Sequence, residues 1–223
     1  MIAAGEHRPP LILDRQRTAL LVIDMQNDFC EPGGYYQRVG RPAERIRQAR
    51  EPIRRLLGAA RVAGLLIVFT RLVYASTLPP VEERHRLLPP AWAGRERRLT
   101  PGSWGAEIVA ELAPQPGEFV IDKGDYSAFY ATSLEVILRR RQIQTLLLTG
   151  TVSYACVLHT AFDAFVRDFD VVLVKDGVSS WFDDLQQATF RIVELLLGRA
   201  VSSEEVLVAL GSVPAVPGER GNG

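Results

Sequence analysis

Short apolar runs alternate with longer amphipathic segments along most of the chain. The apolar runs lie at residues 18–23, 65–70, 118–121, 145–149 and 170–174, and a shorter sixth run lies near Ala200. Apolar runs of this length, without polar alternation, are typical of strands that are buried on both faces of a parallel sheet. The pattern therefore predicts six strands.

Segments with helical periodicity separate these strands. They lie at residues 43–63, 132–141, 156–167 and 183–197, and a further one follows Ser202. Strands that alternate with helices form a mainly parallel sheet with right-handed crossovers. We predict an α/β fold: a single Rossmann-like three-layer domain, with a six-stranded mainly parallel sheet and helices on both faces.

Proline and serine residues refine two of the helix predictions. Pro52 lies inside the segment 43–63, so this helix either kinks there or restarts with Pro52 in its first turn. Ser103 is placed to cap a helix over residues 104–112. Both features shift helix boundaries without changing the fold class.

Two pairs of residues have the spacing of capping boxes. Thr132 with Glu135, and Ser202 with Glu205, each combine a hydroxyl side chain with a glutamate three residues later. Each pair predicts a helix that begins at the hydroxyl residue.

The segments outside this pattern define the expected domain limits. Residues 1–17 are expected to be loosely ordered, residues 18–212 to form the domain, and residues 213–223 to form a disordered tail rich in Gly and Pro. Residues 71–102 are rich in Pro and charge with little periodicity, and long irregular segments inside a domain are usually functional or disordered. We predict a substrate-covering loop there, and a subunit contact is the open alternative.

Composition narrows the function classes. The 223 residues include 26 basic and 26 acidic side chains, a balance that gives no electrostatic footprint for nucleic acid. The N-terminus has no signal-peptide pattern, and no apolar run is long enough to span a bilayer. Two cysteines are too few for a disulfide framework and suit a reducing compartment. We therefore expect a cytoplasmic protein without a nucleic-acid or membrane partner.

Cys156 is the first candidate for chemistry. It follows the apolar run 145–149 and a bridge that contains Gly150, and it begins the helical segment 156–167. The first turn of a helix carries unpaired N–H groups and the positive end of the dipole, which favour a thiolate over a thiol. Cys156 is thus a candidate nucleophile, and an inert buried thiol is the alternative.

Asp24 and Lys123 are expected beside Cys156, because the carboxyl ends of parallel strands meet at one edge of the sheet. Taken singly, an Asp after a strand is often a turn former, and a lone Lys is usually solvated. Together the three residue types fit one task. The carboxylate would accept the thiol proton, and the ammonium would favour the thiolate and orient the carboxylate.

Histidine does not offer a better base. His7 lies in the N-terminal segment and His85 lies in the proline-rich segment. His159 lies one turn into the helix after Cys156, and we rank it as a minor candidate because its side chain need not face the thiol.

Three motifs in this order resemble the isochorismatase-like cysteine hydrolases. They are LLVIDMQNDF at residues 20–29, KGDYSAFYATSLEVIL at residues 123–138 and GTVSYACVLHTAFDA at residues 150–164. The resemblance extends over about residues 19–210, so it covers nearly the whole predicted domain.

This resemblance implies a catalytic triad of Asp24, Lys123 and Cys156 on a six-stranded parallel sheet. It also implies a cis peptide bond between Val152 and Ser153. That bond would aim the backbone N–H groups of Ser153 and Cys156 at one point, as an oxyanion hole.

Departures from the family pattern define the expected subgroup. Ser153 and Tyr154 stand where many members have Thr followed by Asn, so Tyr154 is expected to shape the pocket in its own way. Residues 70–74 lack the Asp and His ligands of the metal-binding, nicotinamidase-like members, so no metal and no other cofactor is predicted. Cys156 argues against the vinyl-ether-cleaving branch, whose members often lack the cysteine.

The resemblance implies amide hydrolysis through a thioester acyl-enzyme, with release of ammonia or an amine. The run DYSAFYATSLEVILRRR at residues 125–141 is closest to members that act on ureido, carbamoyl and other small linear amides. Family members usually form dimers or tetramers, so a homo-oligomer is expected.

Aromatic and polar residues near the motifs are candidates for substrate binding. Arg71 is a candidate partner for a substrate carboxylate, and Gln26 either contacts the substrate or supports its loop. The candidate aromatic pocket walls, each of which has core packing as its alternative role, are Phe29, Tyr35, Trp104, Tyr126, Phe129, Tyr130 and Tyr154.

Three other functions stay open from the sequence. The scaffold could hydrolyse an ester or a vinyl ether, which would give no ammonia. A non-catalytic binding protein is a second alternative, although it would have had no reason to keep all three residues of the triad. In the third, Cys156 is a redox sensor with Cys30 as its resolving partner.

Overall fold

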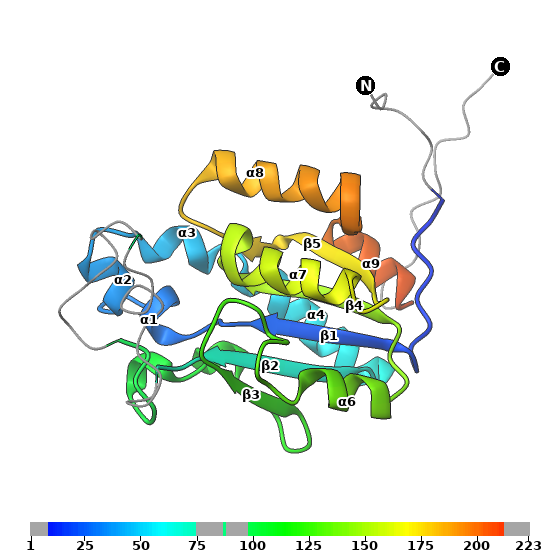
Figure 1. The fold of residues 1–223 in the computed structure, drawn as a ribbon, viewed down its shortest axis with the longest axis horizontal. Helices are drawn as coiled ribbons and strands as arrows, with labels where there is room; N and C mark the ends of the chain where they lie inside the picture. Colours follow the sequence, from blue (N-terminus) through cyan, green and yellow to red (C-terminus); the bar gives the residue numbers. More distant parts are fainter. Residues whose placement is uncertain (1–8, 75–86, 88–97, 212–223) are drawn as a thin grey trace.

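The computed structural model describes residues 9–74, 87 and 98–211 (Figure 1). The predicted tail at residues 213–223 and most of the proline-rich segment 71–102 lie outside these residues, as do the first eight residues. The domain limits and the loop over the substrate therefore stay predictions. No helix among the described residues has the length and apolarity needed to cross a membrane.

Six strands form one sheet, and every neighbouring pair in it is parallel. The strand order is β3-β2-β1-β4-β5-β6, so the chain begins in the middle, fills one side and then crosses to the other. The predicted α/β class and the six-stranded sheet are confirmed. The strands are β1 (Thr18–Ile23), β2 (Leu66–Leu72), β3 (Phe119–Lys123), β4 (Thr145–Thr151), β5 (Asp170–Ser179) and β6 (Gly198–Val201).

Helices cover both faces of the sheet (Figure 1). On one face, α4 (Arg50–Ala63) packs beside α9 (Ser203–Ala209); on the other, α7 (Leu158–Phe165) lies beside α8 (Asp183–Ile192). The remaining helical elements are α1 (Asn27–Cys30), α2 (Tyr35–Arg38), α3 (Ala43–Arg47), η2 (Trp104–Ala106), η3 (Ala110–Leu112), α6 (Leu134–Arg140), η4 (Ser153–Val157) and η5 (Val193–Leu197).

The helix boundaries confirm some cap predictions and correct others. The helical segment restarts after α3, which places Pro52 in the first turn of α4. Ser202 and Glu205 form the predicted capping box. Thr132 and Glu135 do not form the predicted capping box: Thr132 Oγ1 accepts from Leu134 N at 3.2 Å at the start of α6 and donates to Ala128 O at 2.6 Å, while Glu135 pairs with Arg167.

The predicted helix over residues 104–112 is replaced by the short turns η2 and η3. Between these turns the backbone is extended and pairs with the loop after β1. Asn27 N donates to Glu107 O at 2.9 Å, and Val109 N donates to Met25 O at 2.9 Å. Hydrogen bonds to a distant segment thus outweigh the local helical pattern. The sequence alone gave no sign of this pairing.

Gly150 allows β1 and β4 to meet at the carboxyl edge of the sheet. In the β1–β4 pairing it lies opposite Ile23, and its φ is 109°. A Cβ at this position would lie 2.0 Å from the carbonyl oxygen of Ile23, far inside van der Waals contact. Only glycine therefore fits beside the last residue of β1, one position before Asp24.

We predict that Gly150→Ala lowers the free energy of unfolding by about 2–3 kcal/mol, because the added methyl group must push backbone aside. Gly58→Ala is the control, since a Cβ at Gly58 in α4 meets nothing within 4 Å. It should raise stability by up to about 1 kcal/mol through its higher helix propensity. Urea unfolding curves measure both changes, and a neutral Gly150→Ala would refute the steric account.

Candidate functional site

Asp24, Lys123 and the Cys156 sulfur converge at the carboxyl edge of the sheet. Asp24 follows β1 directly. Its backbone has a left-handed φ of 53°, which residues other than glycine rarely adopt. Lys123 is the last residue of β3, where the sequence had placed it just beyond the strand. Cys156 lies in η4, the turn of π-helix that follows β4.

Asp24 and Lys123 form a fully buried ion pair. Asp24 Oδ2 lies 2.7 Å from Lys123 Nζ, and neither side chain has exposed surface. Thr70 Oγ1 donates to the other carboxylate oxygen at 2.6 Å, and Lys123 Nζ donates to Asp125 O at 2.9 Å. These bonds hold both charged groups in one orientation.

The charges decide the protonation states in this site. Burial lowers the pKa of Lys123, but the charge of Asp24 and the side chain of Cys156 outweigh it, so the pKa of Lys123 is raised above its usual value. Burial raises the pKa of the Cys156 thiol to about 12, with Lys123 lowering it and Asp24 raising it. The resting site therefore holds an ammonium and a neutral thiol at neutral pH.

This result changes one expectation. The sequence favoured a thiolate at Cys156, on the grounds of the helix turn and the nearby lysine. The lysine does act in that direction, but Cys156 is only 2% exposed, and burial outweighs the lysine. A role for Cys156 as nucleophile would therefore require a base that takes its proton.

The turn before Cys156 contains one cis peptide bond, which joins Thr151 to Val152. The prediction of a cis bond between Val152 and Ser153 is wrong by one position. No proline marks the bond, so the sequence carries no local signal for its exact place. Val152 O then accepts hydrogen bonds from Ala155 N at 3.0 Å and Val157 N at 3.3 Å, which close the turn around Cys156.

Thr160 connects the nucleophile turn to the loop after β3. Its Oγ1 donates to Cys156 O at 2.7 Å and accepts from Ala128 N at 3.0 Å, and the residue is fully buried. Thr160 therefore fixes the turn that carries Cys156 relative to the loop that follows Lys123. The sequence had included Thr160 in a motif without giving it this task.

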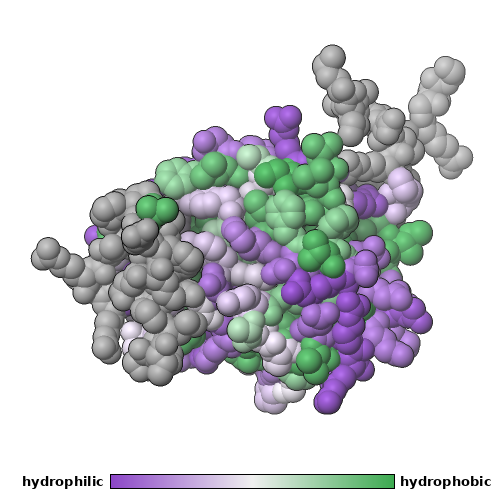
Figure 2. All heavy atoms as spheres, in the orientation of Figure 1, coloured by the Kyte–Doolittle hydropathy of each residue, from purple (hydrophilic) through white to green (hydrophobic). Residues whose placement is uncertain are grey.

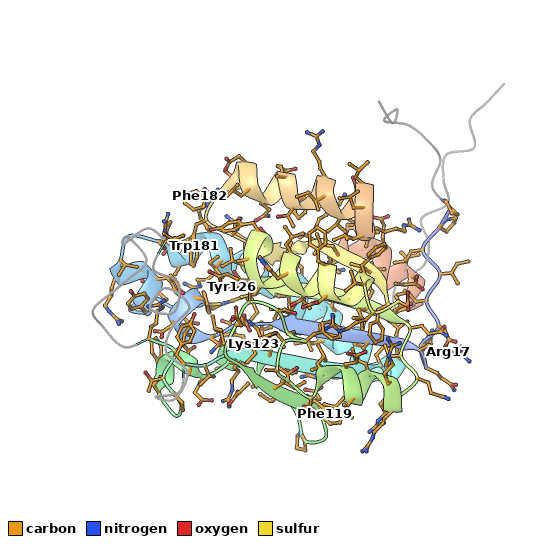
Figure 3. The ribbon with its side chains drawn as sticks, viewed as in Figure 1. Arg17, Phe119, Lys123, Tyr126, Trp181 and Phe182 are labelled. Carbon is orange, nitrogen blue, oxygen red and sulfur yellow. The ribbon has the colours of Figure 1, made fainter. Side chains whose placement is uncertain are left out.

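A cleft of about 280 Å³ opens beside the sulfur of Cys156. One region at the carboxyl edge of the sheet, close to this cleft, contains Lys123, Tyr126 and Trp181 (Figure 3). The residues that line it are Phe29, Tyr36, Leu72, Tyr74, Tyr126, Val152, Tyr154, Ala155, Cys156, His159 and Trp181. Of the predicted pocket walls, Phe29, Tyr126 and Tyr154 line this cleft.

Gln26, Tyr35 and Arg71 are not among these lining residues. Gln26 is fully buried, and its amide donates to Leu72 O and Ala106 O at 2.9 Å each, while its oxygen accepts from Leu72 N at 2.8 Å. These bonds fit the second of its two predicted roles, the support of its loop. Arg71 pairs with Asp122 through two bonds of 2.7 and 3.0 Å.

Four of the predicted pocket aromatics lie elsewhere. Tyr35 is buried edge-on against Tyr36, with ring centroids 5.2 Å apart. Phe129 is buried with its centroid 5.9 Å from that of Phe169. Trp104 and Tyr130 are 55% and 62% exposed and do not line the cleft. Ring type alone did not distinguish pocket walls from core or surface positions.

The sequence missed or undervalued four of the rings that line the cleft. Tyr36, Tyr74 and Trp181 were not named as candidates, and His159 was only a minor one. His159 lies at the cleft with Nδ1 2.9 Å from Ala155 O and its ring centroid 5.2 Å from that of Tyr126. Trp181 lies two residues after the end of β5, so its place close behind a strand was the one available signal.

A second hollow lies at the opposite edge of the sheet. It measures about 520 Å³ and is lined by residues at the amino ends of β2 and β3, together with Arg15, Arg61 and Arg141. Arg61 is bound to Glu118 at 2.8 Å, and Arg15 donates to Leu210 O at 2.7 Å. This hollow is larger than the first, but it lies away from the buried ion pair and the thiol.

Two further observations concern metal and redox chemistry. Within residues 9–74, 87 and 98–211, no group of three or more His, Cys, Asp or Glu side chains is arranged to hold a metal ion. Cys30 and Cys156 are both free, buried thiols, and Cys30 does not line the cleft. Burial raises the pKa of Cys30 to about 12 as well.

Known proteins resemble this chain in sequence. The isochorismatase domain model matches residues 18–205. Ureidoacrylate amidohydrolase RutB from Variovorax paradoxus (strain S110) is 34% identical over 180 residues, which cover 75% of this chain and 71% of that protein.

Solved structures resemble it in fold. A cysteine hydrolase from Pseudomonas syringae pv. phaseolicola 1448A is 25% identical with a TM-score of 0.78, covering 93% of this chain and 99% of that one. N-carbamoylsarcosine amidase from Thermoplasma acidophilum is 27% identical with a TM-score of 0.68, covering 84% and 97%. Since the domain model spans most of the chain and these relatives align over most of its length, the chain belongs to the isochorismatase family.

Proposed function

We propose that the chain is a cysteine-dependent hydrolase that cleaves a C–N bond of a small amide, ureido or carbamoyl compound. One observation carries the proposal: a buried carboxylate, an ammonium and a thiol meet where a cleft opens beside the thiol. The names of two relatives, an amidohydrolase and an amidase, support the same bond type. Homo-oligomer formation and a cytoplasmic location stay predictions.

In the first half of the reaction, Cys156 Sγ attacks the carbonyl carbon of the bound amide, and its proton passes to Asp24. The neutral resting thiol makes this transfer necessary, because a thiol is a weak nucleophile until it is deprotonated. Lys123 keeps its positive charge throughout and stabilises the thiolate as it forms. The backbone N–H groups of Ser153 and Cys156 would bind the oxyanion of the tetrahedral intermediate.

In the second half, the protonated Asp24 donates its proton to the leaving nitrogen, and ammonia or an amine departs. The carbonyl carbon is then bound to Cys156 as a thioester. Asp24, again a carboxylate, takes a proton from water, which attacks the thioester and releases the acid and the thiol. Each proton taken by Asp24 is returned, so the enzyme ends in its starting state.

We predict that Cys156→Ala lowers kcat/KM by about 10⁴-fold or more, because it removes the nucleophile. Ammonia release from a panel of small amides and ureido compounds gives the rate, and intact-protein mass spectrometry detects the acyl adduct in the unmodified chain. Cys30→Ala is the matched control, since it removes the other buried thiol, and it should keep its rate. Hydrolysis of esters without ammonia release from any amide would overturn the proposal.

Asp24→Asn should lower kcat by about 10²–10⁴-fold, the usual contribution of a general acid–base group. The amide keeps the shape of the carboxylate and can still accept a hydrogen bond from Thr70. Circular dichroism establishes that the variant is folded before its rate is compared. A variant that retains full activity would show that Asp24 is not the base.

The thiol of Cys156 should titrate only at alkaline pH, because its pKa is raised from an ordinary value of 9.0 to about 12. Thiolates absorb near 240 nm, so the difference spectrum between the chain and its Cys156→Ala variant reports this group alone. The expected absorbance step lies above pH 9. A step near or below pH 7 would mean that the resting site holds a thiolate, and the role of Asp24 as base would fail.

A further inference from the structure

Thr160 makes two hydrogen bonds of different kinds. Its Oγ1 donates to Cys156 O at 2.7 Å, four residues back along the chain. Threonines in helices commonly make this bond, so by itself it indicates only local helix geometry. The same oxygen also accepts from Ala128 N at 3.0 Å, and Ala128 lies 32 residues earlier, in the loop after β3. The second bond makes Thr160 a bridge between two segments of the site.

Ala128 is the fixed point of the loop that carries a partner of Lys123. Its N–H donates to Thr160, and its carbonyl oxygen accepts from Thr132 Oγ1 at 2.6 Å. The residue is fully buried. Three residues earlier in the same loop, Asp125 O accepts from Lys123 Nζ at 2.9 Å. A shift of Ala128 would therefore move the carbonyl group that holds the ammonium.

A second contact joins helix α7 to the same loop. His159, the neighbour of Thr160, has its ring centroid 5.2 Å from that of Tyr126, and both rings line the cleft. His159 is exposed and Tyr126 is partly exposed, whereas Thr160 and Ala128 are fully buried. Because hydrogen bonds are stronger away from water, the hydroxyl bridge is the firmer of the two contacts.

These bonds form a closed set of short connections around the reactive groups. From Thr160, one connection runs to Cys156 O within one turn of the helix. The other runs through Ala128 and Asp125 O to Lys123 Nζ. Lys123 belongs to the buried ion pair whose two charges shift the pKa of the thiol in opposite directions. The position of the sulfur relative to these charges thus depends on the hydroxyl bridge.

We propose that Thr160 is a positioning residue for the reaction: its hydroxyl group holds Cys156 Sγ where Asp24 can take the thiol proton and Lys123 can stabilise the thiolate. This inference rests on the proposed hydrolysis and adds a residue that acts through the catalytic groups without touching the substrate. An apolar side chain of the same shape cannot replace Thr160, because Ala128 N–H would then be buried without its acceptor.

Thr160→Val keeps the shape of the side chain and removes the hydroxyl group. It should lower kcat about 100-fold, since a misplacement of about 1 Å can have an effect of this size. KM should change less than about threefold, because Phe29 and Trp181 line the cleft from other elements. Thr160→Ser keeps the hydroxyl group, and its kcat should stay within about threefold of the original. Ammonia release from an amide that the unmodified chain hydrolyses gives both constants.

Thr189→Val is the matched control for the loss of a buried hydroxyl group. Thr189 Oγ1 donates to Leu185 O at 2.9 Å, four residues back in helix α8, and the residue is 1% exposed. It does not line the cleft. Thr189→Val should therefore lower the urea midpoint and keep kcat and KM. If Thr160→Val lowers the urea midpoint in the same way and also keeps kcat, Thr160 has only a structural role and the proposal fails.

Alkylation by iodoacetamide reports on the same geometry without turnover. Cys156 Sγ displaces iodide from the methylene carbon of the reagent, and the thiol proton passes to Asp24 and then to water. Thr160→Val should slow this reaction about tenfold, because the thiolate forms less readily when it is displaced from Lys123. Peptide mass spectrometry separates Cys156 from Cys30, which does not line the cleft and serves as the internal reference. Alkylation of Cys156 at an equal or higher rate in the variant would overturn the proposal.

The two measurements separate this inference from the proposed function. If no amide releases ammonia but Thr160→Val slows the alkylation of Cys156 as expected, the proposed function fails and the positioning role stands. If hydrolysis depends on Cys156 and Thr160→Val keeps its kcat, the function stands and the inference is wrong. Should Thr160→Val not fold, Thr160→Ala takes its place, since alanine favours a helix and adds no bulk. Unchanged alkylation of Cys156 in that variant would equally refute the inference.

Discussion

Asp24 and Lys123 place two opposite charges inside the protein, where neither has contact with water. Such a pair is stable only when both partners are present and well bonded, because removal of one leaves the other charge buried alone. Thr70 and Asp125 O supply the additional bonds. The pair also ties the carboxyl end of β1 to that of β3, two strands away in the sheet. The arrangement of the whole edge depends on this contact.

The same burial controls the protonation of the Cys156 thiol. A low-dielectric site beside a carboxylate keeps Cys156 protonated, and this protects the thiol from chance reaction while no substrate is present. The lysine reduces the penalty for forming the thiolate without removing it. In the proposed mechanism, reactivity is linked to a proton transfer within the site, and that transfer is useful only when a substrate occupies the cleft.

The space-filling view shows that apolar side chains also gather on the face over α7 and α8 (Figure 2). Phe162, Phe165 and Val166 of this region are exposed, and so are Leu195 and Leu196 of η5. This surface is separate from the cleft, whose rings are mostly buried. Of these two apolar surfaces, the cleft is the one that Cys156 lines.

The sequence by itself determined the six strands, the α/β class and the three residues that meet at the sheet edge, because each depends on local periodicity or on a motif at a strand end. Tertiary structure decided the rest. Whether a ring lines the cleft, as Trp181 does, or fills the core, as Phe129 does, depends on neighbours distant in the chain. Arg71 was a candidate for a substrate carboxylate, and Gln26 for either the substrate or its own loop; contacts across the fold use both side chains. Burial, which fixes the protonation of Cys156, arises only once the chain has folded around it.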